Sequence, residues 1–386
     1  MFSLLLAIIY LAFISLGLPD SLLGSAWPVM QTELGVPISY AGIITMIIAG
    51  STIVSSLLSD RMIRKMGAGL VTAISVAMTA AALMGFSLSP RFWMLCLWAI
   101  PYGLGAGAVD AALNNYVALH YSSRHMSWLH AFWGVGVSIS PAVMGACLSG
   151  GAGWAGGYRV ISLFQIALTA VLFFSLPLWK KTDGTDEDGT VTEALSLGQV
   201  LRLRGAPCVL IAFFAYCALE QTTGLWASSY LVEFRHISEI SAARFASLYY
   251  MGIMIGRFLN GFIADKFGDK TMIRVGILTA CAGIAMVALP IKVDFIALAG
   301  LLVIGLGAAP IYPCIIHSTP TNFGRENSQS MVGVQMAAAY VGTTFMPPLF
   351  GLIAQYVSIG LYPAFLMLFA LFALIMTERL NKLTQK

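Results

Sequence analysis

The chain has 386 residues, of which 59% are hydrophobic and 10% are charged, and its formal net charge at pH 7 is +4. Soluble domains carry about 25% charged residues, so this composition, with a mean hydropathy of +0.85, excludes a soluble globule. Apolar runs of about 20 residues recur along the chain, which predicts an integral membrane protein made of helices rather than of short alternating strands.

Twelve apolar segments predict twelve transmembrane helices. They lie at residues 2–31, 40–59, 68–88, 92–120, 127–148, 158–179, 206–232, 242–264, 272–290, 294–318, 330–355 and 360–377. The first has no basic residues before it and no clear cleavage site, so we expect a retained span. A polar linker at 181–205 separates the predicted domains 1–180 and 206–386, and residues 192–203 are expected to form a short amphipathic helix on the membrane surface.

The distribution of basic residues predicts the orientation. If the N-terminus is cytoplasmic, fifteen Lys and Arg residues fall in inner loops and the C-terminal tail and five in outer loops, while Arg257 lies within the eighth segment. Lys and Arg concentrate on the cytoplasmic side of membrane proteins. We therefore expect both termini in the cytoplasm. We also expect a monomeric multi-pass protein of a bacterial inner membrane or plasma membrane.

Three of the seventeen acidic residues lie inside predicted spans: Asp20, Asp110 and Glu220. A charged side chain at the bilayer centre costs about 3 kcal/mol on insertion scales, so such residues are rare and their default interpretation is functional. These three acids are therefore the first candidates for a site.

The two halves of the sequence resemble each other. "DSLLGSAW" from Asp20 matches "EQTTGLW" from Glu220, "SDRMIRKMG" from Ser59 matches "GFIADKFGDK" from Gly261, and "YGLGAG" in the fourth span matches "IGLGAA" in the tenth. The offsets are 200, 205 and 202 residues, in the same order along the chain. This predicts a duplicated six-helix unit, a plan in which transporters place a substrate site between the halves.

"GFIADKFGDK" resembles the signature loop of the major facilitator superfamily, and "SDRMIRKMG" is similar to a degraded copy of it. The second copy matches at Gly261, Asp265, Lys266, Gly268 and Lys270, and the first matches at Asp60, Arg61, Arg64 and Lys65. Ser56 and Ile63 stand in the first copy where the family has glycines. The resemblance implies an all-α fold of twelve transmembrane helices in two pseudo-symmetric six-helix bundles, and transport by alternating access.

A narrower resemblance rests on the acid in the first span, the "GLGAG" of the fourth span and "LHAFWGVGVSISP" (Leu129 to Pro141) in the fifth. Together they resemble the fucose:proton symporter branch of that superfamily. This implies proton-coupled uptake of a sugar.

Asp20, Asp110 and His130 are the candidates for proton coupling. Three explanations stay open for Asp20: it carries the proton, it accepts a hydrogen bond from a substrate hydroxyl, or it bonds permanently to a neighbouring helix. Asp110 and Asn114 share a helix face, and His130, near the start of the next span, can meet Asp110 at similar depth. In the alternative, Asp110 bonds a neighbouring helix and His130 faces the headgroups.

A sugar site requires planar hydrogen-bonding groups and aromatic faces. The candidate substrate-binding residues are Trp27, Asn114, Asn115, Trp133, Glu220, Gln221, Trp226, Gln335 and Tyr340. The alternative for the aromatic members is helix packing or a place at the membrane interface.

The acids of the signature loops are candidates for gating. An acid at the end of a span can bond the positive N-terminal end of a neighbouring helix or a basic residue. The gating candidates are Asp60, Arg61, Arg64, Arg257, Asp265 and Lys266. In the alternative, these residues only form a turn and anchor the chain in the membrane.

No residue pattern indicates an enzyme, a cofactor, a metal site or a nucleic-acid partner. The six cysteines stand singly in apolar runs, and there is no Walker loop. "GLGAG" and "GLGAA" lie inside spans without a preceding strand, so we interpret their glycines as helix-packing residues.

The predicted function is proton-coupled import of a small polar solute such as a sugar. The partners would be that solute, protons in preference to sodium, and the lipid bilayer. A proton-driven exporter of amphipathic drugs or lipids, which the 19 methionines would suit, is the alternative, and a membrane receptor or scaffold without transport is a third.

Overall fold

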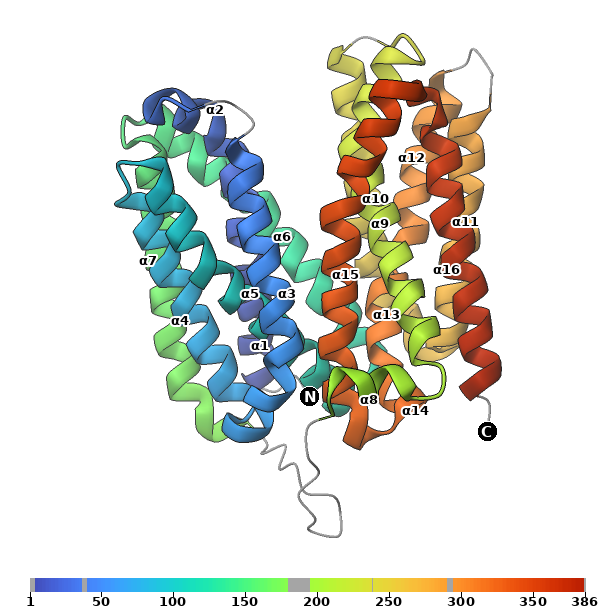
Figure 1. The fold of residues 1–386 in the computed structure, drawn as a ribbon, viewed down its shortest axis with the longest axis horizontal. Coiled ribbons are helices and arrows are strands. Elements are labelled where there is room, and N and C mark those ends of the chain that lie inside the picture. Colours follow the sequence, from blue (N-terminus) through green and yellow to red (C-terminus); the bar gives the residue numbers. More distant parts are fainter. Residues whose placement is uncertain (1–3, 37–39, 180–194, 238, 290–293, 385–386) are drawn as a thin grey trace. The chain divides into compact units, whose positions relative to one another are not determined.

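The computed structural model describes residues 4–36, 40–179, 195–237, 239–289 and 294–384 (Figure 1). This part of the chain consists of helices and short connections and contains no strand. The chain forms two compact units. Unit 1 comprises Met1–Tyr116 and Leu129–Ala194, and unit 2 comprises Val117–Trp128 and Leu195–Lys386.

Unit 1 is a helix bundle that includes most of α5 and α6. Its helices are α1 (Leu4–Asp20), α2 (Leu22–Leu34), α3 (Tyr40–Met66), α4 (Ala68–Ser87), α5 (Phe92–His120), α6 (Ser123–Ser149), α7 (Gly153–Ser175) and the 3₁₀ turn η1 (Leu176–Leu178). The end of α5 and the start of α6 belong to unit 2, and we call Val117–Trp128 the connecting segment.

Unit 2 is built from the remaining helices. They are α8 (Leu197–Arg202), α9 (Ala206–Glu233), α10 (Glu239–Phe267), α11 (Asp269–Ala288), α12 (Asp294–Ala308), α13 (Ile311–His317), α14 (Thr319–Phe323), α15 (Arg325–Ile353), the π turn η2 (Ala354–Ser358), the 3₁₀ turn η3 (Ile359–Leu361) and α16 (Tyr362–Thr384). The short helix α8 falls within the expected amphipathic stretch 192–203, whose residues 192–194 lie outside the described residues. Residues 181–194 of the predicted linker also lie outside them.

The predicted all-α membrane fold is confirmed. Nine helical stretches of the described chain are long and apolar enough to cross a membrane, and one of them, Arg325–Thr384, contains both α15 and α16. Together with the first segment (α1 and α2) and with α10, they account for the twelve predicted spans.

Two predicted spans are broken helices rather than continuous ones, each near a proline. Pro19 has no N–H to donate to the carbonyl of Ser15, and the Gln165 side-chain amide of α7 donates to that carbonyl instead, at 2.7 Å. α1 ends one residue later, at Asp20. In the tenth segment α12 ends before Pro310, and the Tyr216 hydroxyl donates to the Ala308 carbonyl at 3.0 Å. Freed backbone groups at membrane depth thus find partners inside the protein.

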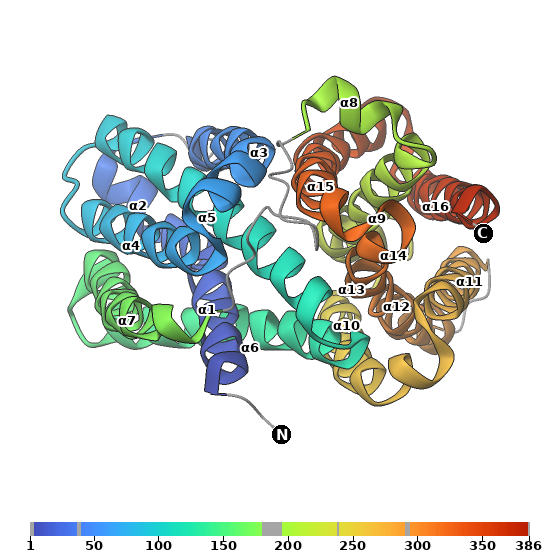
Figure 2. The same ribbon diagram turned by 90° about the horizontal axis from the view of Figure 1, so that it is seen from below.

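The glycines of the two "GLGA" sequences bring helices into close contact. A Cβ on Gly103 or Gly107 of α5 would overlap backbone oxygens of α3, and one on Gly105 would crowd the Ser75 carbonyl of α4. Figure 2 shows α5 beside both of these helices. The Thr52 hydroxyl of α3 also donates to the Gly103 carbonyl, at 3.1 Å. Small residues at such interfaces let backbones approach closely.

The second glycine sequence packs in the same way. A Cβ on Gly305 of α12 would overlap the Tyr249 carbonyl of α10, and one on Gly307 would overlap backbone atoms of Ala280 in α11. In both units, therefore, the glycine-bearing helix packs against the two spans that precede it. This agrees with the duplication that the sequence predicts.

The turn glycines of the two signature loops are Gly67 and Gly268. Both adopt a positive φ, 79° and 76°, with ψ of 153° and 155°, and each is followed directly by the next helix. This backbone conformation is accessible to glycine and strongly disfavoured for other residues. Ile63, at the expected glycine position of the first copy, is buried within α3. The turn therefore comes four residues later than the motif spacing implies.

The glycine contacts predict opposite effects for two matched substitutions. Gly103→Ala should destabilise the protein by about 1–3 kcal/mol, because the methyl group forces α5 away from α3. Gly50→Ala in α3, where a Cβ meets nothing within 4 Å, should be neutral or stabilise by up to about 1 kcal/mol, because alanine favours the helix. Thermal unfolding of the two purified variants checks this. Equal effects would contradict the packing role of Gly103.

Candidate functional site

Asp20 lies at the end of α1 and receives two hydrogen bonds from neighbouring helices of unit 1. The Tyr102 hydroxyl of α5 donates to Oδ1 at 3.0 Å, and the Trp133 indole N–H of α6 donates to Oδ2 at 2.9 Å. Both donors are neutral, and the Asp20 side chain remains exposed on the unit. The carboxylate is thus held by dipoles and stays accessible to a small molecule or a proton.

The position of Asp20 follows from close packing between α1 and α6. A Cβ on Gly17 would overlap the Trp133 carbonyl, and one on Gly136 would overlap the Ile14 carbonyl. The Ser21 hydroxyl, at the break after α1, donates to the Val137 carbonyl of α6 at 2.8 Å. These contacts fix the end of α1 beside Trp133.

Asp110, Asn114 and His130 form a buried chain of hydrogen bonds. The Asn114 amide donates to Asp110 Oδ1 at 2.7 Å, and His130 Nε2 lies 3.0 Å from Asn114 Oδ1. The expected common helix face of Asp110 and Asn114 is therefore present, and Asn114 bridges the acid to the histidine. His130 is 6% exposed and its ring contacts the Phe13 ring edge to face. Asn115, the residue after Asn114, is also buried.

Glu220 and Arg257 form an ion pair inside unit 2. Arg257 of α10 approaches Glu220 Oε1 of α9 at 2.9 Å, and the two side chains are 5% and 13% exposed. The Tyr249 hydroxyl donates to the Glu220 backbone carbonyl at 2.9 Å, and Tyr216 lies close enough to interact with the pair. Arg257, one of the gating candidates, thus pairs with Glu220, one of the substrate candidates. Removing one member of such a pair leaves an uncompensated charge.

The other residues expected to bind substrate are dispersed in the described structure. The Trp226 indole donates to the Pro347 carbonyl of α15 at 2.9 Å and packs against Phe350, a contact that joins two helices. Gln221 is exposed.

Three further substrate candidates lie in α15 and α2. Gln335 is fully buried and accepts a hydrogen bond from Thr319 at 3.0 Å, whereas Tyr340 is half-buried. Trp27 belongs to α2, and its side chain lies outside the described part of the structure.

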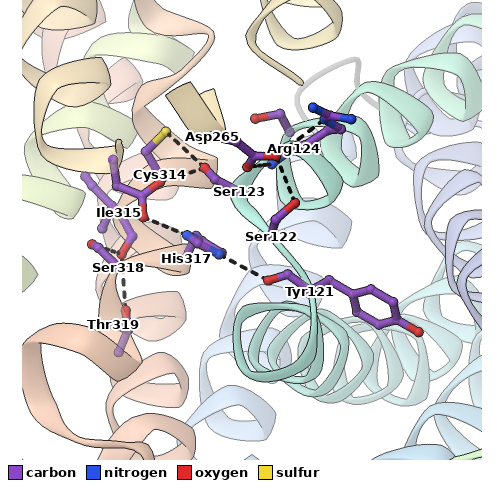
Figure 3. Close-up of polar contacts among 12 residues, drawn as sticks. Tyr121, Ser122, Ser123, Arg124, Asp265, Cys314, Ile315, His317, Ser318 and Thr319 are labelled. Atoms are coloured by element: carbon purple, nitrogen blue, oxygen red, sulfur yellow. Dashed lines mark hydrogen bonds and ion pairs between the residues drawn. The ribbon is translucent and has the colours of Figure 1, made fainter. Parts of the chain in front are cut away.

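Asp265 bonds the start of α6 through the connecting segment (Figure 3). Its carboxylate accepts from the backbone N–H of Arg124 at 3.1 Å and from the Ser122 hydroxyl at 3.1 Å. The Arg124 side chain adds an ion pair at 3.4 Å. This is the acid-to-helix-terminus contact that the signature loop predicts, and the positive end of a helix stabilises an acid there.

The first signature loop is arranged differently. Asp60 is buried and pairs with Arg64 on its own helix at 2.7 Å. Arg61 is exposed, as is Lys266 in the second loop.

Asp269, a second acid of the second signature loop that no sequence pattern singles out, binds a histidine. His317 Nδ1 at the end of α13 lies 2.6 Å from Asp269 Oδ2, and its Nε2 lies 3.2 Å from the Tyr121 carbonyl. The Ser123 hydroxyl donates to Asp269 Oδ1 at 2.6 Å. Figure 3 shows His317 directed at Tyr121. His317 is 48 positions from Asp269 and 196 positions from Tyr121, so the sequence carries no local signal for this cluster.

The chain matches known transporters over nearly its whole length. A family model described as the Major Facilitator Superfamily matches residues 9–290 and 209–382. The uncharacterized transporter y4wD of Sinorhizobium fredii is 25% identical over 347 residues, which are 85% of each protein. A glucose/galactose transporter of Brucella abortus is 25% identical over 338 residues, 82% of this chain and 79% of that protein.

Two solved structures share the fold. The transporter FucP in its outward conformation has a TM-score of 0.79 at 14% identity and covers 99% of both chains. A second structure, of the E. coli fucose:proton symporter FucP, has a TM-score of 0.77 at 16% identity and covers 99% of this chain and 98% of that one.

The bridge through Asn114 predicts an energetic coupling that depends on it. Asp110→Asn and His130→Gln should lower stability non-additively, with a coupling of about 0.5–3 kcal/mol. In an Asn114→Ala background the same cycle should give a coupling near zero, because the amide connects the two groups. Thermal unfolding of the purified variants measures both cycles. A coupling that survives in Asn114→Ala would show that Asp110 and His130 act on each other directly.

Proposed function

The chain belongs to the Major Facilitator Superfamily and is therefore a multi-pass membrane transporter, and from that premise we propose that it takes up a small polar solute, in first place a sugar, in symport with protons. The observation that carries the proposal is the Asp20 carboxylate, which stands at a helix break in an apolar span between two neutral donors.

The chemistry of Asp20 suits coupling. A carboxylate in a membrane bundle is costly unless it is neutralised or hydrogen-bonded, and binding a proton removes the charge without removing the acceptor for Tyr102 or Trp133. A sugar hydroxyl can both donate to this carboxyl group and accept from the same donors. Proton and solute therefore compete for, or share, one set of groups, which is what coupling requires.

The names of related proteins support the choice of solute and coupling ion. The Brucella relative is a glucose/galactose transporter, and one structural neighbour is a fucose:proton symporter. A sugar is also consistent with the amides and aromatic side chains among the candidate residues.

The remaining candidates take roles consistent with their surroundings. Asp110 and His130 would bind the relayed proton, and Asn114, hydrogen-bonded to both, would hold them in position. Glu220 would contact the solute when its bond to Arg257 rearranges. The proposed solute contacts also include Trp27, Asn114, Asn115, Trp133, Gln221, Trp226, Gln335 and Tyr340.

Gating would be carried by the signature loops, with Asp265 and its bonds to the connecting segment as the main contact. A contact that exists in only one conformation shifts the populations toward that conformation. Asp60, Arg61, Arg64, Arg257 and Lys266 would modulate this equilibrium. We place this end of unit 2 and both termini in the cytoplasm, in a monomer of a bacterial inner or plasma membrane.

A ligand screen tests the class of solute. Purified protein is heated with neutral hexoses, hexuronates, nucleosides or lipophilic cations. A bound solute at 100 times its Kd stabilises the folded state by about 2.7 kcal/mol, so we expect a raised unfolding temperature with a sugar. Stabilisation by lipophilic cations alone would contradict uptake of a polar solute and indicate an exporter.

Asp20→Asn tests the coupling role. The variant should lose uphill accumulation of the solute in proteoliposomes while retaining exchange of labelled solute, because an amide keeps hydrogen bonding but does not titrate. Glu33→Gln is the matched control, since Glu33 also accepts from an indole N–H, that of Trp154 at 2.6 Å, but lies outside the proposed site. Equal loss of accumulation and exchange in Asp20→Asn would indicate a role in binding or folding instead.

A further inference from the structure

The connecting segment is bonded to four different helices of unit 2. Asp265 of α10 accepts from Ser122 and Arg124, and Asp269 of α11 accepts from Ser123. His317 of α13 meets the Tyr121 carbonyl. Arg325 of α15 donates to the Leu119 carbonyl at 3.1 Å. The segment is therefore fastened at Leu119 and at each residue from Tyr121 to Arg124, and one of the fastening groups is a histidine.

A hydrogen-bond acceptor faces each of the two ring nitrogens of His317. Its Nδ1 faces the Asp269 carboxylate at 2.6 Å and its Nε2 faces the Tyr121 carbonyl at 3.2 Å. A neutral imidazole has one N–H, and a carbonyl oxygen only accepts. A neutral ring beside an ionised Asp269 can therefore make only one of the two bonds.

Both bonds form when the pair holds one more proton. That proton makes the ring an imidazolium that donates from both nitrogens, or it resides on Asp269, which then donates to Nδ1 while Nε2–H donates to Tyr121. The proton count is the same in the two cases. The Ser123 hydroxyl, which donates to the other Asp269 oxygen, is compatible with either.

We propose that the pair formed by His317 and Asp269 is a proton-binding site whose proton fastens the connecting segment to α11 and α13. The site extends the proposed gating role of Asp265, and it does not depend on which solute is carried. Because histidine changes charge near physiological pH, a rise in pH at this end of the unit removes one of the two bonds and loosens the segment.

The neighbouring charges leave His317 as the pH-sensitive member of the cluster. The charged or titratable groups that face the site or lie on the segment are Asp265 and Asp269, Arg124 and Arg325, Cys314, Tyr121, His120 and His125. Asp265 accepts from a hydroxyl and a backbone N–H, and Arg325 donates to a backbone carbonyl, so the partners of both side chains do not titrate near neutral pH. His125 contacts the rings of Tyr121 and Trp128, so it serves as the control histidine.

The connecting segment joins α5 to α6, the two helices that carry the proposed proton relay. α5 and α6 continue from the two ends of the connecting segment to Asn114 and His130, the bridge and the base of the buried chain. A proton at His317 therefore holds in place the ends of the two helices that carry the proposed relay.

Nitrogen-15 NMR of histidine-labelled protein in nanodiscs tests the proton itself. The chain has five histidines, and the signal missing in His317→Gln identifies this ring. We expect both of its nitrogens to be bound to hydrogen, or its Nδ1 to be strongly hydrogen-bonded to a protonated Asp269, at mildly acidic pH. An isolated neutral tautomer there would overturn the proposal.

Hydrogen exchange of residues 117–128, corrected for the intrinsic rate at each pH, tests the fastening. In the wild type, protection should fall by about tenfold or more as His317 loses its proton, the size expected for a charge-assisted hydrogen bond. His317→Gln should abolish this pH dependence and His125→Gln should retain it. Asp269→Asn should also abolish it, and thermal unfolding confirms that each variant is folded.

An unchanged pH dependence in both His317→Gln and Asp269→Asn would refute the site. Neither measurement reads transport, so failure of the proposed function leaves this test intact, and failure of this test leaves solute uptake in place.

Discussion

A polar group inside an apolar helix bundle must find its hydrogen-bond partner within the protein, and this constraint determines where the candidate site lies. Pro19 frees the Ser15 carbonyl, which the Gln165 amide satisfies from another helix. One residue beyond that proline the helix ends and Asp20 is presented to Tyr102 and Trp133. The break that costs backbone bonding is thus also what places a carboxylate at the end of a helix within a membrane span.

Close packing between helices brings these hydrogen-bond partners within bonding distance. α5 approaches α3 through Gly103 and Gly107, and the same helix carries Tyr102, which bonds Asp20, and Asp110, which bonds Asn114. A larger residue at either glycine would move the donors as well as the helix. α5 therefore contributes to both packing and site geometry, because its glycines face neighbouring helices while Tyr102 reaches Asp20.

The sequence was sufficient for features that depend on composition, period and repetition. The twelve spans, the two glycine sequences and the common face of Asp110 and Asn114 are of this kind. Pairings between helices were not predictable, because they depend on the relative register and rotation of two helices: Glu220 meets Arg257, and His317 meets Asp269. The shift of the first signature turn to Gly67 was also missed, because motif spacing does not reveal that α3 continues past Ile63.

Glu220, Asp269 and Asp20 have different kinds of hydrogen-bond partner, and this difference bears on the role proposed for each acid. Glu220 has a cation held 2.9 Å away, so protonating it leaves Arg257 buried without its counter-ion. Asp269 faces the His317 imidazole at 2.6 Å, so its partner is itself a titratable group. Asp20 has two neutral donors, and protonating it strands no opposite charge. Of these three, Asp20 is therefore the acid that we propose for coupling, because neither binding a proton nor bonding a solute hydroxyl would require an ion pair to break first.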